Sequence, residues 1–422
     1  MTVPAGGAAP QHPPDRPAGG PAVVDAAAVA ARADSASRLD PSARLDPAAR
    51  RLGIGMVGYA FMGAAHSQAW RNVNRFFQVP FTIDMAAVVG RTKPSVTAAA
   101  GKLGWRTYET DWRALLTRDD IDVVDICTPG DSHAEIAIAA LDAGKHVICE
   151  KPLANSVEEG EAMTEAAARA RDRGIAAMVG FNYRRVPAIA LARELTAAGM
   201  LGTVWHVRAQ YLQDWIVDPE FPLTWRLQRE RAGSGALGDI GAHIVDATQF
   251  VLGEQLVGVS GLTETFIRDR PGGTVTVDDC ALFLGRFAGR AVATYEATRL
   301  ATGRKNGLRI EINGSDGSLA FDLEEMNELR FYRTDEDPAT AGFRRILVTD
   351  PSHPYMDAWW PPGHLIGYEH TFTNQARDFL AALGSGTPPS PSFADGLQVQ
   401  RVLAAVEESA ANRSVWTSTG VE

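Results

Sequence analysis

The sequence predicts two structural units: an α/β domain with a parallel sheet, followed by an α+β domain with a large, mostly antiparallel, open-faced sheet. Between residues 51 and 180, short apolar runs alternate with helical patterns, which is typical of a parallel sheet with crossover helices. The first apolar run ends in a glycine-rich turn. After about residue 188 the alternation stops and strand-like runs joined by glycine turns dominate. We expect the α+β domain, which would bind substrate and form oligomer contacts, over residues 181–416.

The bulk composition argues against several classes of protein. The chain has 422 residues, 45% hydrophobic and 22% charged, with a formal net charge of −10 and no cluster of Lys and Arg. Nucleic-acid binding is therefore not expected. The three cysteines, Cys127, Cys149 and Cys280, are too scattered for a disulfide framework or a zinc site, and we expect no metal. No apolar run approaches the roughly 20 residues that a membrane span needs, so we expect a cytoplasmic protein.

The first 50 residues differ in kind from the rest of the chain. They consist mainly of Ala, Pro, Gly, Arg and Asp, with almost no large apolar side chains. Such a segment cannot bury enough apolar surface to offset its ordering entropy. We expect a disordered tail over residues 1–50, with at most a marginal helix after Ala22, and a second short tail over residues 417–422.

The glycine-rich turn has the spacing of a dinucleotide-binding fingerprint. It reads Gly58-Tyr59-Ala60-Phe61-Met62-Gly63 and follows the first apolar run. Gly58 suits a tight turn, a small residue at 60 lets the backbone approach a pyrophosphate, and Gly63 lets the following helix pack closely on the strand. Alanine replaces the usual middle glycine and adds only a methyl group. We therefore expect a Rossmann NAD(P)-binding domain over residues 51–180, with Gly58, Ala60, Phe61, Met62 and Gly63 at the cofactor.

Further buried strands are expected over residues 83–90, 122–129 and 146–150, with helices over 93–104 and 132–144. Ligands bind at the carboxyl ends of such strands. These ends carry Arg91, then Thr128 and Pro129, then Glu150 and Lys151. The second strand lacks the acid that binds the adenosine ribose, and Arg91 suits the 2′-phosphate of NADP, which the sequence slightly favours. Stacking of Arg91 on adenine would instead leave NAD open.

The second half places its most informative residues near the start of a helix. Asp239 and His243 are four residues apart, so they share a helical face, and the carboxylate could orient the imidazole. An Asp that caps the helix beside a surface His is the plain alternative. Four glycines before and within this stretch imply a close backbone approach. We also expect a helix over 189–198 and two terminal helices, over 368–383 and 393–412, that return to the body of the protein.

These motifs, taken in order, resemble the Gfo/Idh/MocA oxidoreductase family over residues 51–416. The likeness rests on GxAxxG at 58–63, TP with His133, EKPLA at 150–154, GFNYR at 180–184 and GALGDIGAH at 235–243. The resemblance implies that Lys151, Asp239 and His243 form the catalytic set. It also implies nicotinamide contacts near Thr128, Pro129 and His133, and a homodimer or homotetramer. Ala60 and Arg91 depart from the family pattern, and Arg91 leaves the choice of cofactor open.

The expected reaction moves a hydride between nicotinamide and a secondary alcohol or ketone of a cyclic sugar or polyol. His243, oriented by Asp239, is the first candidate for the base, and Lys151 would position the hydroxyl; the two roles could be exchanged. Pro152 holds Lys151 at the strand end, and Glu150 would face the cofactor ribose or pair with the lysine.

Candidate substrate-binding residues are Tyr183, Arg184, Trp225, Arg226, Asp239, His243, His364 and Tyr368, whereas Trp359 and Trp360 are as readily core or interface residues.

Two other functions fit the same fold. The first is a glycoside-processing enzyme that oxidises a sugar transiently and recycles its bound NAD. The second is a non-catalytic protein that senses nucleotides. Retention of Lys151, Asp239 and His243 together argues against the sensor.

Overall fold

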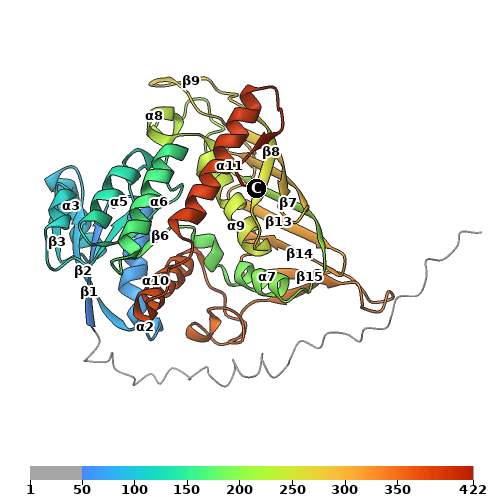
Figure 1. Ribbon diagram of the computed structural model, residues 1–422, viewed down its shortest axis with the longest axis horizontal. Helices are drawn as coiled ribbons and strands as arrows, with labels where there is room; N and C mark the ends of the chain where they lie inside the picture. The colour runs from blue at the N-terminus through green and yellow to red at the C-terminus, as the bar shows by residue number, and fades with distance from the viewer. Residues whose placement is uncertain (1–49, 422) are drawn as a thin grey trace, which may run out of the picture.

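The computed structural model describes residues 50–421 and contains two sheets with a pair of C-terminal helices between them (Figure 1). The N-terminal tail and the marginal helix after Ala22 lie outside the described residues, apart from Arg50, which begins the first strand. Within residues 50–421, no helix is both long and apolar enough to cross a membrane. The predicted order of an α/β unit followed by an α+β unit is confirmed.

The first sheet has six parallel strands in the order β3-β2-β1-β4-β5-β6. Its strands are β1 (Arg50–Val57), β2 (Phe81–Val89), β3 (Thr107–Glu109), β4 (Val123–Ile126), β5 (His146–Cys149) and β6 (Ala177–Val179). Its helices are α2 (Phe61–Phe76), α3 (Lys93–Leu103), α4 (Arg113–Leu116), α5 (His133–Asp142) and α6 (Val157–Arg171), with the short turn η1 (Gly130–Ser132) before α5. The sequence analysis missed β3, because three residues are too few to show a hydrophobic period.

The second sheet has nine strands in the order β16-β15-β14-β13-β7-β12-β11-β8-β17. Its strands are β7 (Val204–Leu212), β8 (Leu256–Glu264), β11 (Cys280–Phe287), β12 (Val292–Thr298), β13 (Gly307–Gly314), β14 (Gly317–Asp322), β15 (Glu328–Arg333), β16 (Arg344–Leu347) and β17 (Thr417–Ser418). Only the β7–β12 pair is parallel. β17 pairs with β8, so residues 417 and 418, which were expected to form a tail, belong to the sheet.

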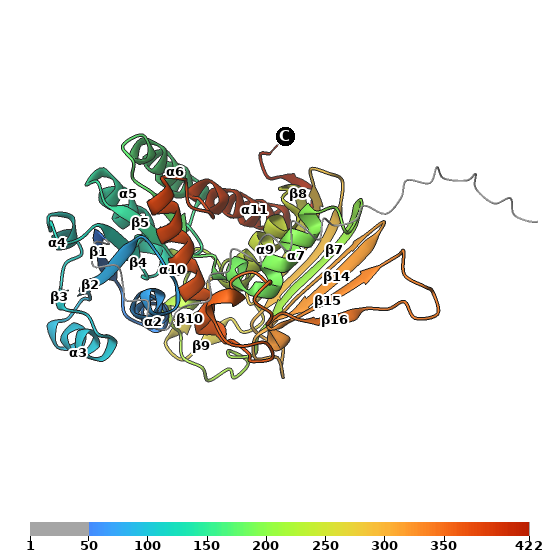
Figure 2. The same cartoon turned by 90° about the horizontal axis from the view of Figure 1, so that it is seen from below.

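One face of this large sheet is covered by helices. Figure 2 shows α7 (Pro187–Ala197) and α9 (Ala242–Leu252) on the covered face, and the described residues place no helix on the other. Burial alternates along β11, as expected for a sheet with one wet face. The shorter elements are η2 (Asn182–Arg185), η3 (Trp225–Leu227), α8 (Arg229–Ala232), the π-helical turn η4 (Leu237–Gly241), the two-stranded pair β9 (Asp269–Arg270) and β10 (Gly273–Thr274), η5 (Leu323–Glu325) and η6 (Met356–Ala358).

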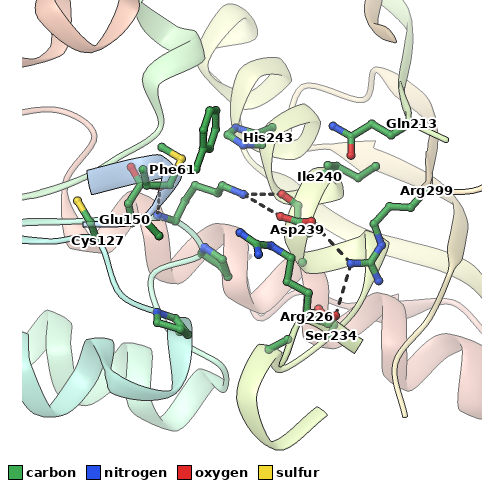
Figure 3. Close-up of a pocket in the computed structure, with 18 of the residues that line it drawn as sticks. Phe61, Cys127, Glu150, Gln213, Arg226, Ser234, Asp239, Ile240, His243 and Arg299 are labelled. Atoms are coloured by element: carbon green, nitrogen blue, oxygen red, sulfur yellow. Dashed lines mark hydrogen bonds and ion pairs between the residues drawn. The ribbon is translucent and has the colours of Figure 1, made fainter. Parts of the chain in front are cut away.

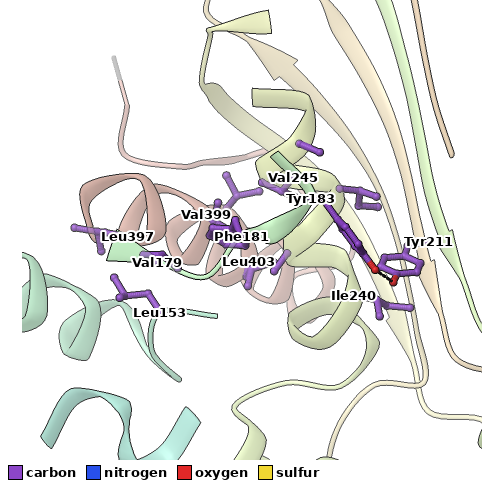
Figure 4. Close-up of a cluster of buried hydrophobic side chains, with 14 of the residues drawn as sticks. Leu153, Val179, Phe181, Tyr183, Tyr211, Ile240, Val245, Leu397, Val399 and Leu403 are labelled. Carbon is purple, nitrogen blue, oxygen red and sulfur yellow. Dashed lines mark hydrogen bonds between the residues drawn. The ribbon is translucent and has the colours of Figure 1, made fainter. Parts of the chain in front are cut away.

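The two terminal helices join the units, as expected. Helix α10 (Tyr368–Ser385) packs on α2, where Phe372 and Phe379 belong to the same buried cluster as Trp70. Helix α11 (Phe393–Ala411) lies between α6 and β8. Figure 4 shows Leu397, Val399 and Leu403 of α11 beside Val179 and Phe181, which follow the first sheet. This continuous apolar packing fixes the carboxyl ends of the parallel strands opposite the second sheet.

Candidate functional site

A cavity of about 610 Å³ lies between the two units, where the parallel strands end (Figure 3). The first unit contributes Ala60, Phe61, Met62, Cys127, Thr128, Pro129, Gly130, Glu150 and Lys151 to its wall. The second contributes Tyr211, Gln213, Trp215, Trp225, Arg226, Asp239, His243, Arg299 and Asn306, and Tyr183 and Tyr368 also line it. Most of the site residues named from the sequence therefore meet in one place.

The turn before α2 is built to receive a pyrophosphate. Gly58 has φ +96°, and a Cβ there would lie 2.7 Å from the carbonyl oxygen of Cys127. A Cβ on Gly63 would collide with the carbonyl oxygen of Gly58. Ala60 caps α2 without a side-chain hydrogen bond, and the first turn carries no acid. The first amides of α2 thus have no side-chain cap and lie at the wall of the cavity. Free amides at a helix N-terminus are the groups that bind the pyrophosphate of a dinucleotide.

Lys151 crosses from the first unit to the second. Its Nζ donates to the carbonyl oxygen of Asp239 at 2.6 Å and lies 3.5 Å from the carboxylate oxygen Oδ1. The lysine side chain is only 12% exposed. The sequence predicted that the strand end delivers this lysine to the pocket, and the arrangement matches that expectation.

Asp239 lies in the turn η4, which is fixed by a buried acid. The backbone amides of Gly235 and Leu237 donate to Asp278 at 2.6 and 2.8 Å, and a Cβ on Gly235 would collide with the carbonyl oxygen of Asp278. This contact explains Gly235, the second of the four dense glycines. Burial alone would raise the pKa of Asp239, but the charges of Lys151 and Arg299 outweigh it and hold the pKa below its usual value.

His243 does not pair with Asp239, contrary to expectation. It lies at the start of α9, and no hydrogen bond joins the two side chains among residues 50–421; Asp239 faces Lys151 and Arg299 instead. The imidazole is 8% exposed, its ring packs 4.6 Å from that of Tyr183, and its buried Nδ1 has no hydrogen-bond partner among the described residues. Burial first, and then the charge of Lys151, hold the pKa of His243 well below its ordinary value, so the ring is neutral.

Glu150 does not pair with the ammonium group of Lys151, which was one of its two expected partners. Its Oε1 lies 2.9 Å from Nε2 of His66, and its Oε2 accepts from the backbone amide of Lys151 at 3.3 Å. His66 is a buried residue of α2 that the sequence analysis missed. The sequence feature that could have identified His66 was its position three residues after Gly63, about one helical turn into the cofactor-binding helix.

A chain of polar groups on the second sheet was also missed. Tyr183 and Tyr211 share a hydrogen bond of 2.7 Å, and the Tyr211 hydroxyl donates to Oδ1 of Asn306 at 2.8 Å. Gln213 donates to the same oxygen at 2.8 Å and accepts from Trp215 at 3.0 Å. Tyr183, which the sequence analysis did name, lies in η2. Tyr211 lies on β7, Gln213 and Trp215 follow it, and Asn306 lies between β12 and β13; no local motif distinguishes these four from ordinary residues.

Four residues named from the sequence lie away from the cavity or do not line it. His364 is exposed and bonded to the carbonyl oxygen of Pro361. His133 is buried with its ring between the carbonyl oxygens of Thr128 and Pro152, so it supports the wall. Arg184 is bound in a buried ion pair with Asp246. Arg91 is exposed at the end of β2.

The structure separates the tryptophans that line the cavity from those that pack elsewhere. Trp225 lines the cavity, and the guanidinium of Arg226 stacks 4.4 Å from its ring centroid. Trp359 and Trp360 instead pack against Phe76 of α2, outside the cavity. Cys127 and Cys149 are buried free thiols, as expected.

Comparison with known proteins agrees with this arrangement. Residues 52–181 match the profile of the oxidoreductase family with an NAD-binding Rossmann fold, and residues 189–320 match the GFO/IDH/MocA C-terminal domain. The chain belongs to the Gfo/Idh/MocA oxidoreductase family.

Similar members of the Gfo/Idh/MocA family include a levoglucosan dehydrogenase from Pseudarthrobacter phenanthrenivorans. It is 42% identical, over 86% of this chain and 97% of that protein. A solved oxidoreductase domain protein from Kribbella flavida is 66% identical, with a TM-score of 0.87 over 88% of this chain and 100% of that one. A levoglucosan dehydrogenase solved with NADH and levoglucosan is 42% identical, with a TM-score of 0.85 over the same shares. The predicted family, fold and dehydrogenase class are confirmed.

Gly63 offers a direct test of the cofactor-binding turn. Gly63→Ala must displace the carbonyl of Gly58, so we expect lower stability and at least about tenfold weaker binding of NADH, measured by fluorescence titration. Gly101→Ala on α3 is the matched control, because a Cβ there meets nothing within 4 Å. That change should stabilise the protein by about 0.5–1 kcal/mol, as alanine usually does within a helix. Equal behaviour of the two variants would contradict the close packing at Gly63.

Proposed function

We propose that this protein is an NAD-dependent dehydrogenase of a cyclic sugar, with levoglucosan or a similar anhydro- or pyranose sugar as substrate. The observation that carries the proposal is the single cavity that joins the glycine turn of α2 to Lys151 and His243. Bound NAD would lie along the turn and accept a hydride from a secondary alcohol carbon. The sugar class follows from the 42% identity to levoglucosan dehydrogenase over nearly the whole length of that protein.

The proposed proton acceptor is His243. Oxidation of an alcohol removes a hydride from carbon and a proton from the hydroxyl group, so a base must lie within hydrogen-bond reach. The neutral ring of His243 has a buried Nδ1 without a partner among the described residues. Lys151 is held by Asp239 and serves as the hydrogen-bond donor that stabilises the developing alkoxide.

The remaining wall suits a sugar. Gln213 and Asn306 offer amide groups for hydroxyls, and Trp215 and Trp225 offer flat apolar faces for the ring. The guanidinium of Arg226 has no ion pair within 4 Å in the described part of the chain and lies in the cavity beside Asp239 (Figure 3). We propose that these residues select the sugar, whereas Lys151 and His243 perform the proton chemistry.

The function is tested by following absorbance at about 340 nm with levoglucosan, related pyranoses and cyclic polyols in the presence of NAD. A net dehydrogenase produces NADH in proportion to the sugar oxidised. Turnover without added cofactor and without a net absorbance change would favour the glycoside-processing alternative. Binding of NADH with no turnover of any sugar would favour the nucleotide sensor.

Lys151→Ala should lower kcat about 100-fold or more. The change removes the cationic donor that reaches from the first unit across the cavity to Asp239, and such donors typically contribute factors of this size. The KM for the sugar should change much less. Lys102→Ala, which removes an exposed lysine of α3, is the control and should retain full activity. A near-normal kcat for Lys151→Ala would contradict the mechanism.

We propose NAD(H) rather than NADP(H) as the physiological cofactor. A relative at 42% identity was solved with NADH, and the slight preference for NADP rested on Arg91 alone. Arg91 is exposed and has no ion pair in the described part of the chain, so it can stack on adenine or contact a phosphate. Wild-type protein should therefore bind NADH more tightly than NADPH in fluorescence titrations.

Arg91→Ala should weaken NADPH binding by about tenfold and NADH binding by less than about threefold, because only the former loses an ion pair with the 2′-phosphate. Binding constants for both cofactors in both proteins measure this. Tighter NADPH than NADH binding by the wild type would overturn the choice of NAD.

We further propose that the protein forms a homo-oligomer through the uncovered face of the large sheet. Exposed apolar side chains gather there on β7, β8, β11 and β12: Trp205, Leu262, Leu282, Leu284 and Val292. Leu282 faces Leu262 across the β8–β11 pairing. Exposed apolar side chains gathered on one sheet face are typical of a protein–protein interface, and a two-fold arrangement would bury them in both copies.

Leu284→Arg should dissociate this oligomer, because it places two unpaired charges in a self-complementary interface. Light scattering coupled to size exclusion would report the fall in mass. Leu365→Arg is the control, since Leu365 is 62% exposed and lies before α10, away from this face. An unchanged mass for Leu284→Arg would show that another surface forms the interface.

A further inference from the structure

A chain of charged side chains lies directly behind the cofactor end of the cavity. Nδ1 of His66 is 3.0 Å from both carboxylate oxygens of Asp125 on β4, and its Nε2 is 2.9 Å from Oε1 of Glu150. The indole of Trp70 donates to Asp125 at 2.7 Å. Asp125, His66 and Glu150 are 0%, 3% and 4% exposed, so water screens none of these contacts.

Both ring nitrogens of His66 face carboxylates, and a doubly protonated imidazole can donate a hydrogen bond to each. Burial opposes the charge, but the Asp125 carboxylate outweighs it and raises the pKa of His66 well above its ordinary value. Two carboxylates and one imidazolium leave one net negative charge on the chain.

A metal at the same place is the alternative, since donor atoms of His66, Asp125 and Cys127 lie within 4.8 Å of one another. The hydrogen bonds already present use the donor atoms of His66 and Asp125. Burial also raises the pKa of Cys127 to about 12, so the thiol keeps its proton. The hydrogen-bonded chain is therefore the better description.

Glu150 brings this charge to the cavity. It ends β5, immediately before Lys151, and lines the same wall as Ala60 and Thr128. Gly180 makes the position possible, because a Cβ there would lie 2.6 Å from Oε1 of Glu150. Glu150 also accepts the backbone amide of Lys151. The carboxylate therefore borders the place where a nicotinamide ring must lie to exchange a hydride with a sugar held between Lys151 and His243.

We propose that the Asp125–His66–Glu150 chain makes the cavity favour the oxidised cofactor, with His66 as the positioning residue that holds the Glu150 carboxylate in place. This inference rests on the proposed dehydrogenase function. The oxidised nicotinamide ring carries one positive charge and the reduced ring carries none. A fixed negative charge beside the ring stabilises the first form selectively.

The test compares the dissociation constants of NAD⁺ and NADH in binary complexes, without sugar, by calorimetry and fluorescence titration. Glu150→Gln keeps the shape and the acceptor for His66 but removes the charge. We expect the ratio of the NAD⁺ constant to the NADH constant to rise by at least about tenfold, the size expected for one poorly screened charge a few ångströms away. Glu135→Gln, which neutralises an exposed acid on α5 that pairs with Arg113, should leave the ratio unchanged.

His66→Gln should move the ratio in the same direction, because it removes the hydrogen-bonded counter-cation that holds the Glu150 carboxylate in place. If that variant fails to fold, Glu150→Gln decides alone. Equal weakening of both cofactor forms would mean that Glu150 supports the cofactor only by shape or by a ribose contact, and would overturn the inference. Wild-type protein that binds neither form would instead overturn the proposed function itself, and this inference with it.

Discussion

The contact between Lys151 and the backbone of Asp239 links the two halves of the site. The lysine follows the parallel strand β5, and Asp239 lies in a π-helical turn of the second unit, so neither unit alone contains the proposed catalytic set. The ammonium group donates to a carbonyl oxygen at 2.6 Å in a largely buried setting. A shift of even 1 Å between the units would break this bond. The rest of the molecule must therefore hold the two sheets at a fixed distance.

The C-terminal helices meet that requirement. α10 covers α2, and α11 lies between α6 and β8, so one end of the chain packs on both units. Much of this contact is apolar, with Phe379, Leu380 and Val402 fully buried. Burial of large side chains of this kind contributes about 1.5–3 kcal/mol each, so together they outweigh the single Lys151–Asp239 ion pair at the cavity. Packing thus sets the distance, and the polar contact then sets the orientation of the reactive groups.

The sequence predicted those features that depend on local pattern. The glycine turn, the strand ends, the lysine before Pro152 and the terminal helices each leave a short periodic or motif signal, and each was found. Features that depend on pairing across the fold were missed. His66 meets Glu150 across 84 residues and Tyr211 meets Asn306 across 95, and no spacing rule links residues so far apart. The expected Asp239–His243 pair was wrong for the same reason: helical spacing placed them together, but Lys151 and Arg299 compete for the carboxylate.

The charges that the fold assembles are unequal on the two sides of the cavity. On the sugar side, Lys151, Arg226 and Arg299 face one carboxylate, that of Asp239. On the cofactor side, the chain through His66 leaves one net negative charge. In the proposed reaction, removing a proton from a sugar hydroxyl would create a negatively charged oxygen beside the positively charged nicotinamide ring. The cationic side chains lie on the side of that oxygen, and the anionic chain lies on the side of the ring. In the proposed mechanism the fold therefore lowers the cost of forming the alkoxide next to oxidised nicotinamide, which compensates for the weak basicity of the buried His243.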